Sequence, residues 1–209
     1  LNAGEARQFA DWGFNRAHPV PSLRAAVERV AEGRERTMAR LLMCDLEAYR
    51  HPDHAERPLS AQQAIGLAAK LESELPERQA EFLRIQARLT EEILGDFKGA
   101  IVLFTKLNQP PGTDFDVARC LEKMGDNNAA FLKYGEIYAT CSKDGNGAEA
   151  LWRQGVMANE KLNERSKAIL ILRQVCDEFP GSGQYGNAHN YLQQRLDTVY
   201  TGGGGKRER

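Results

Sequence analysis

Apolar residues in the stretch 163–182 follow a helical spacing, although the four consecutive aliphatic residues from Ile169 to Leu172 resemble a buried strand. Counted from Ala168, the apolar positions fall at i, i+1, i+4, i+7, i+8 and i+11, which is one face of an α-helix. A half-buried strand would alternate, and no alternation extends beyond the four residues. Pro180 disfavours helical geometry in Phe179 before it. The pattern therefore predicts a helix that ends near residue 179.

The same pattern recurs as an alanine, a large residue four positions later and an aliphatic residue seven positions later. The three copies are Ala100, Phe104 and Leu107; Ala130, Tyr134 and Ile137; and Ala168, Leu172 and Val175. Five and four positions before these alanines stand pairs typical of a tight turn, Gly95-Asp96, Gly125-Asp126 and Asn163-Glu164. A fainter copy begins at Ala64. The marker alanines stand 36, 30 and 38 residues apart, which indicates a structural repeat.

A second helical pattern precedes each turn. Pro76, which suits a first helical turn, opens the pattern of residues 76–94. Thr113-x-x-Asp116 opens that of residues 113–124 like a capping box, and the third covers residues 148–162, where Gly155 would let helices approach closely. One residue before each turn pair stands an apolar residue expected to pack in the core: Leu94, Met124 and Leu162. Each repeat is therefore predicted to be two helices joined by a short turn, without strands.

The first third of the chain is less regular. Residues 21–50 show helical spacing, His51 to Pro58 reads as a loop, and Ser60-x-x-Gln63 predicts the cap of a new helix. At the other end, residues 184–199 predict a helix that covers the open end of the stack, followed by a flexible, basic tail. We therefore expect an N-terminal helical segment with a possible divergent repeat over 1–76, repeats and a capping helix over 77–199, and a tail over 200–209.

Composition excludes few functions. The formal net charge of −1 gives no reason to expect nucleic acid or an anionic membrane as a partner. No apolar run approaches the roughly 20 residues that span a bilayer, and no signal peptide is visible. Because the chain begins with Leu1 rather than Met, a removed leader or anchor stays open. The compartment is accordingly expected to be either the cytoplasm or the bacterial periplasm.

Candidate chemistry is sparse. The four cysteines are widely spaced and form no C-x-x-C pair, which favours buried free thiols over disulfides or a zinc site. His51 and His54 stand three apart across Pro52, which favours solvated loop residues over metal ligands. The glycine run before Lys206 has no preceding strand or following helix and is not a phosphate loop. We expect no catalytic residues, no metal and no cofactor.

The repeat resembles the tetratricopeptide repeat, a helix pair with Gly-Asp at its turn, then alanine and an aromatic residue, and a closing proline. The best match is Glu149 to Ser182, which carries Trp152, Ala168 and Pro180. Two departures stand out: the usual glycine of the first helix is one position early at Gly155, and Ser142 replaces a closing proline. The segment "CDEFPGSGQYGNAHNYL" also resembles repeats of bacterial cell-envelope proteins.

The resemblance implies an all-α fold, a right-handed α-solenoid of antiparallel helix pairs. It also implies a non-enzymatic scaffold that binds a protein or peptide partner in the groove lined by the first helix of each pair. The partner-binding residues that it implies are Phe115, Arg119, Lys123, Arg153, Met157 and Lys161, with Glu122, Glu160, Ile85, Leu89 and Glu92 at equivalent positions. The alternative is a regulatory or scaffold domain of a larger, truncated enzyme or envelope-assembly protein. The sequence leaves the oligomeric state open.

Overall fold

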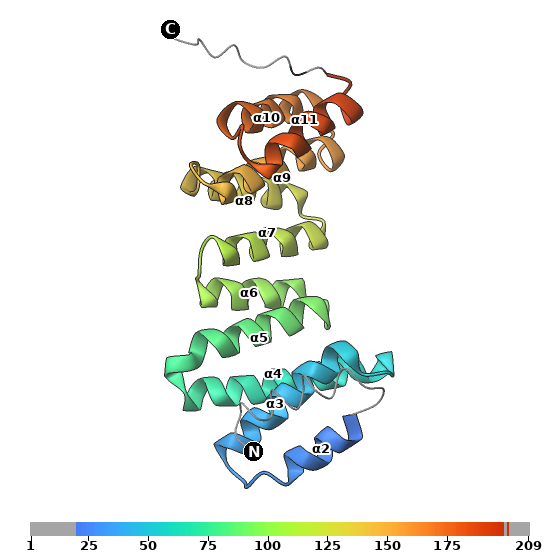
Figure 1. Cartoon of the computed structure of the whole chain (residues 1–209), viewed down its shortest axis with the longest axis vertical. Coiled ribbons are helices and arrows are strands. Elements are labelled where there is room, and N and C mark those ends of the chain that lie inside the picture. The colour runs from blue at the N-terminus through green and yellow to red at the C-terminus, as the bar shows by residue number, and fades with distance from the viewer. Residues whose placement is uncertain (1–19, 199, 201–209) are drawn as a thin grey trace. The chain divides into compact units, whose positions relative to one another are not determined.

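The structure is a computed structural model that describes residues 20–198 and 200. These residues form ten α-helices and two short 3-10 helices, without a strand among them (Figure 1). The all-α helical-repeat fold expected from the sequence is confirmed. The chain divides into two compact units, Leu1–Asn108 and Gln109–Arg209. The sequence boundary at residue 76 stays a prediction, and the basic tail lies outside the described residues apart from Tyr200.

The first unit is a succession of helices in which each packs on the next (Figure 1). Its α-helices are α2 (Val20–Glu28), α3 (Arg34–Arg50), α4 (Arg57–Glu74), α5 (Gln79–Glu92) and α6 (Phe97–Leu107), with 3-10 helices at His54–Glu56 and Pro76–Arg78. Leu41, Ala68, Phe82 and Leu89 belong to its buried core. Small residues on α4 allow this packing, because Ala61, Ala64 and Ala68 are all fully buried.

The start of α4 differs from the sequence prediction. The helix begins at Arg57 with Pro58 in its first turn, a position where the missing N–H of proline removes no helical hydrogen bond. Ser60 therefore lies within the helix and is buried, so the predicted cap at Ser60 is wrong. The predicted loop is also shorter, because His54–Glu56 forms a 3-10 turn and Asp53 caps it by accepting the N–H of Ala55 at 2.9 Å.

The second unit has the same construction. It contains α7 (Gly112–Met124), α8 (Asn127–Thr140), α9 (Gly145–Glu160), α10 (Arg165–Glu178) and α11 (Gly183–Arg195). The helix predicted before Pro180 is α10. Within its aliphatic run, however, only Leu172 is fully buried, and Leu170 points outward with 68% of its surface exposed. The final helix ends at Arg195 rather than near residue 199, although Leu196 beyond it is still buried against the core.

The repeat turns confirm the sequence pattern. Gly95, Gly125 and Asn163 adopt left-handed backbone with φ of 66°, 80° and 56°, a conformation that glycine and asparagine tolerate best. The residue that follows each one donates its N–H back to the preceding helix: Asp96 to the Thr90 carbonyl at 3.0 Å, Asp126 to Leu121 at 3.0 Å, and Glu164 to Ala158 at 2.8 Å. All four marker alanines are fully buried. The turns and alanines therefore mark true structural repeats.

Two predictions at the ends of α7 are wrong. Thr113 is not a cap: it lies buried in the first turn, and its hydroxyl accepts the N–H of Gln109 at 3.0 Å. The helix starts one residue earlier because Pro111 precedes it as the N-cap residue. At the other end, Met124 is exposed rather than packed. Among residues 20–198, no helix combines the length and apolarity that a membrane crossing requires.

Candidate functional site

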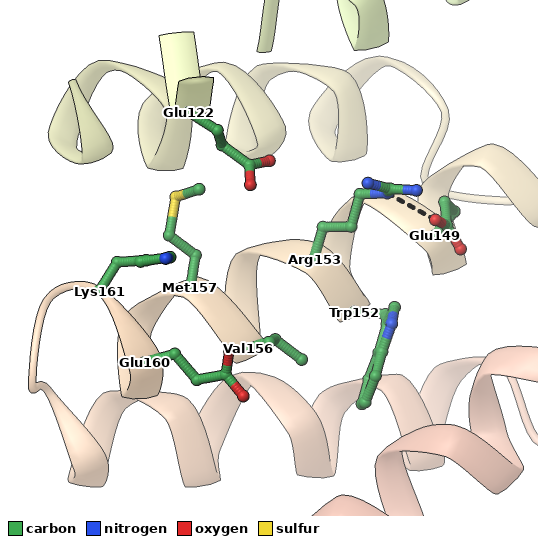
Figure 2. Close-up of a pocket in the computed structure, with 8 residues that line it drawn as sticks. All are labelled: Glu122, Glu149, Trp152, Arg153, Val156, Met157, Glu160 and Lys161. Atoms are coloured by element: carbon green, nitrogen blue, oxygen red, sulfur yellow. Dashed lines mark hydrogen bonds and ion pairs between the residues drawn. The ribbon is translucent and has the colours of Figure 1, made fainter. Parts of the chain in front are cut away.

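The second unit carries a cleft of about 260 Å³ on one face of α9 (Figure 2). Its lining consists of Glu122 from α7 and seven residues of α9 and its C-terminal end: Glu149, Trp152, Arg153, Val156, Met157, Glu160 and Lys161. The α9 residues recur every three or four positions, so they share one side of the helix. Glu122 reaches into the cleft from α7, and Met157 points toward it from α9 (Figure 2). Two helices of successive repeats thus form the cleft.

The side of α9 that faces away from the cleft packs closely against neighbouring helices. Gly155 is buried against α10, where an added Cβ would lie 2.8 Å from the Leu172 side chain. Ala150 and Ala158 are also fully buried in the core. These small residues bring α9 close to its neighbours on one side. The cleft lies on another side of the helix, which carries longer side chains such as Arg153 and Glu160.

Two carboxylates in the cleft are held by tyrosine hydroxyls. Tyr134 of α8 donates to Glu122, and burial together with this hydrogen bond raises the pKa of Tyr134 well above its usual value. Tyr191 of α11 donates to Glu160 at 2.8 Å. The Tyr191 ring also meets Trp152 edge to face, with 5.5 Å between ring centroids, a geometry that aromatic pairs favour. Packed aromatic residues therefore position both acids.

The third acid, Glu149, forms an ion pair inside the cleft. Arg153 Nε donates to one carboxylate oxygen of Glu149 at 2.5 Å, and Gln184 Nε2 donates to the other at 2.6 Å. Burial acts to lower the pKa of Arg153, but Glu149, through its hydrogen bond and charge, and the neighbouring Tyr134 hydroxyl together outweigh it and raise that pKa. The guanidinium therefore stays charged and lies beside a carboxylate of its own helix.

The structure brings together three of the six partner-binding residues expected from the sequence. Arg153, Met157 and Lys161 line the cleft, although Met157 is only 4% exposed. The others lie on α7 and do not line it: Phe115 packs against Tyr134 at 6.2 Å between centroids, Arg119 pairs with Asp116 at 2.7 Å, and Lys123 is exposed. Partner binding by all six stays a prediction.

Other expected groove residues have mixed outcomes. Glu122 and Glu160 line the cleft as expected. Leu89 is fully buried in the core of the first unit and has no surface for a partner. Sequence reasoning missed Glu149, Trp152 and Val156. Their shared spacing with Arg153 and Glu160 on one helical face was the available signal.

The described residues show little that resembles a reactive centre. Cys44, Cys120 and Cys176 are buried as expected, and burial raises the pKa of the Cys44 thiol to about 11, which disfavours the reactive thiolate. Within residues 20–198, no three or more histidine, cysteine or acidic side chains gather in a way that could hold a metal ion. A second cleft, of about 280 Å³, lies in the first unit, and its lining includes Arg34, Arg36, Arg40 and Lys70.

Comparison with known proteins connects the cleft on α9 with a family. The family model described as tetratricopeptide repeat matches residues 149–182, which contain most of α9 and all of α10. No curated protein matches the chain. Tetratricopeptide repeats are generally non-enzymatic, and their presence suggests a scaffold for interactions between proteins. The likeness to cell-envelope members stays a prediction. The chain is a tetratricopeptide-repeat-like protein, and its matched repeat contributes seven of the eight residues that line the cleft.

Proposed function

We propose that the protein is a non-enzymatic scaffold and that the cleft on α9 binds an extended or helical segment of a protein partner. The observation that carries this proposal is the position of the cleft, because seven of its lining residues come from the matched repeat. The role would be the same if the chain were the scaffold part of a larger enzyme or of an envelope-assembly protein.

The composition of the cleft supports a peptide ligand. Trp152 and Val156 supply apolar surface above the buried Met157, while acidic and basic side chains surround them. A volume of about 260 Å³ is near the lower end of small-molecule pockets, which are roughly 300–1,000 Å³. It therefore suits one or two side chains of a longer segment, whose remaining length would lie along the surface of α9.

The test compares two arginine substitutions on neighbouring helices. Val156→Arg places a long charged side chain in the cleft, and Leu170→Arg places the same side chain on the outward face of α10. Peptides would first be selected on the wild-type protein from a phage-displayed dodecapeptide library. We expect Val156→Arg to weaken the selected peptides by at least about tenfold, because it fills the site. Leu170→Arg should leave their affinity unchanged.

Isothermal titration calorimetry gives the affinities, and far-UV circular dichroism shows that both variants keep their helical content. Peptides that bind Val156→Arg as tightly as the wild type would exclude the cleft. A loss of binding confined to Leu170→Arg would instead assign recognition to the outward face of α10.

A further inference from the structure

This inference rests on the proposed function and concerns the chemistry of the bound segment. We propose that the cleft prefers a basic segment and holds one of its arginine or lysine side chains between Glu122 and Glu160. The matching partner surface is therefore cationic with apolar residues beside the charge.

Tyrosine hydroxyls hold these two acids of the cleft. Tyr134 and Tyr191 each donate a hydroxyl hydrogen bond, to Glu122 and Glu160 respectively. A hydroxyl is a neutral donor, so it orients a carboxylate without cancelling its charge, and each carboxylate can accept further hydrogen bonds. Glu149 differs, because its partner in the cleft is the cationic Arg153.

The two tyrosine hydroxyls and the carboxylates they bind are preorganised for a ligand. Tyr134 is fully buried, and its raised pKa keeps the hydroxyl protonated across the physiological range. Asn159 donates to the Tyr191 hydroxyl at 3.0 Å, which directs the tyrosine proton to Glu160. Acceptors fixed in this way lose little freedom when a ligand arrives. Both carboxylates are thus in place before binding.

Apolar surface lies beside these acids on α9. Val156 and Trp152 lie on the same face of α9 as Glu160, and both are partly exposed. Arginine and lysine carry their charge on a long apolar stem that packs on such surface. An acidic side chain has a short stem and would meet carboxylates of the same sign.

The remaining charge in the cleft defines a competitor. Arg153 is paired to Glu149 and also meets the Tyr134 hydroxyl that binds Glu122. Lys161 is the other cation that lines the cleft. A bound arginine or lysine would be repelled by this ammonium group. Removing the Lys161 charge should therefore strengthen binding, while removing either carboxylate should weaken it.

The experiment uses two defined fluorescent decapeptides with the full chain, one alternating leucine with arginine and one alternating leucine with glutamate. Fluorescence anisotropy measures their dissociation constants. We expect the arginine peptide to bind more tightly, Glu122→Gln and Glu160→Gln each to weaken it by about threefold, and Lys161→Gln to tighten it by about twofold. Glutamine keeps an acceptor for each tyrosine, so the packing is retained. Added salt should reduce the differences.

Glu136→Gln is the matched control, since it makes the same change of charge on an exposed position of α8 outside the cleft. If it weakens the arginine peptide as much as the cleft variants do, the attraction is general and the inference fails. Preferred binding of the glutamate peptide, with loss of binding in Val156→Arg, would overturn the basic preference and leave the proposed function intact. Failure of Val156→Arg to affect either peptide, or failure of both peptides to bind, would overturn the inference. The proposed function would fail as well only if Val156→Arg bound the library-selected peptides as tightly as the wild type does.

Discussion

Gly155 tests whether the close approach of α9 and α10 organises the second unit. Alanine has the higher intrinsic helix propensity, so replacing a glycine in a helix interior normally stabilises the fold by about 0.5–1 kcal/mol. At Gly155 the new Cβ would lie 2.8 Å from both Cγ and Cδ2 of Leu172 and 3.2 Å from Cγ2 of Ile171. Leu172 is fully buried and cannot move aside freely. The gain in propensity is therefore opposed by overpacking.

Overpacking of a buried contact typically costs about 1–3 kcal/mol. Subtracting the gain in propensity from the middle of this range, we expect Gly155→Ala to lower the free energy of unfolding by about 1 kcal/mol. The matched control is Gly186→Ala in α11 of the same unit, where a Cβ would meet nothing within 4 Å. This control should be neutral or slightly stabilising.

Urea unfolding followed by far-UV circular dichroism measures both variants. A double-mutant cycle with Leu172→Val tests the cause, because a smaller residue at position 172 should relieve part of the penalty of Gly155→Ala and give a favourable coupling energy. Stabilisation by Gly155→Ala equal to that of Gly186→Ala would refute the reasoning. Additive effects of the two substitutions would show that Leu172 is not the opposing contact.

Two further predictions concern an ion pair between α2 and α3 and the cap of α9. Arg24 of α2 donates to both carboxylate oxygens of the buried Glu47 at 2.8 and 3.0 Å, so Arg24→Ala should lower the free energy of unfolding by about 2 kcal/mol. Adding Glu47→Gln should recover part of this loss in chemical denaturation, and no recovery would mean that the Glu47 charge is not the cause. Asp144 caps α9 by accepting the N–H groups of Asn146 and Gly147, and these bonds, chiefly the one from Gly147, lower its pKa. Its stabilisation should be present above about pH 4 and lost as the pH falls through the lowered pKa, so a melting-temperature difference from Asp144→Ala that persists at pH 2 would contradict the assignment.

The repeats were predictable because their signals are local. A left-handed turn demands glycine or asparagine, and a buried contact between helices demands alanine, so Gly125 and Ala130 follow directly from the chain. Helix starts were less predictable. The motifs that begin at Thr113 and Ser60 resemble caps, but α7 begins one residue before Thr113 and α4 begins three residues before Ser60. Each of these helices has a proline at its start instead. The outward position of Leu170 was also predictable, because the helical spacing counted from Ala168 leaves it off the apolar face.

The cleft was predictable only in part, because the pairing of its charges depends on contacts with other helices. The face of α9 that carries Arg153 and Lys161 follows from helical spacing, and these residues do line the cleft. Which charges are already paired depends on neighbouring helices: Gln184 and Tyr191, both from α11, contact the acids of α9. Such contacts arise from packing between repeats and leave no local pattern in the sequence.

The turns at Gly95, Gly125 and Asn163 also bear on how the chain folds. Each is closed by a backbone hydrogen bond between residues only five or six positions apart, and most of its geometry is set by a single left-handed residue. Contacts so close in sequence have a small entropy of loop closure, and chains rich in them fold quickly. In a repeat array, a helix pair formed at one such turn can serve as the template on which the next pair docks. The same few residues that join the two helices of each repeat are therefore natural starting points for folding.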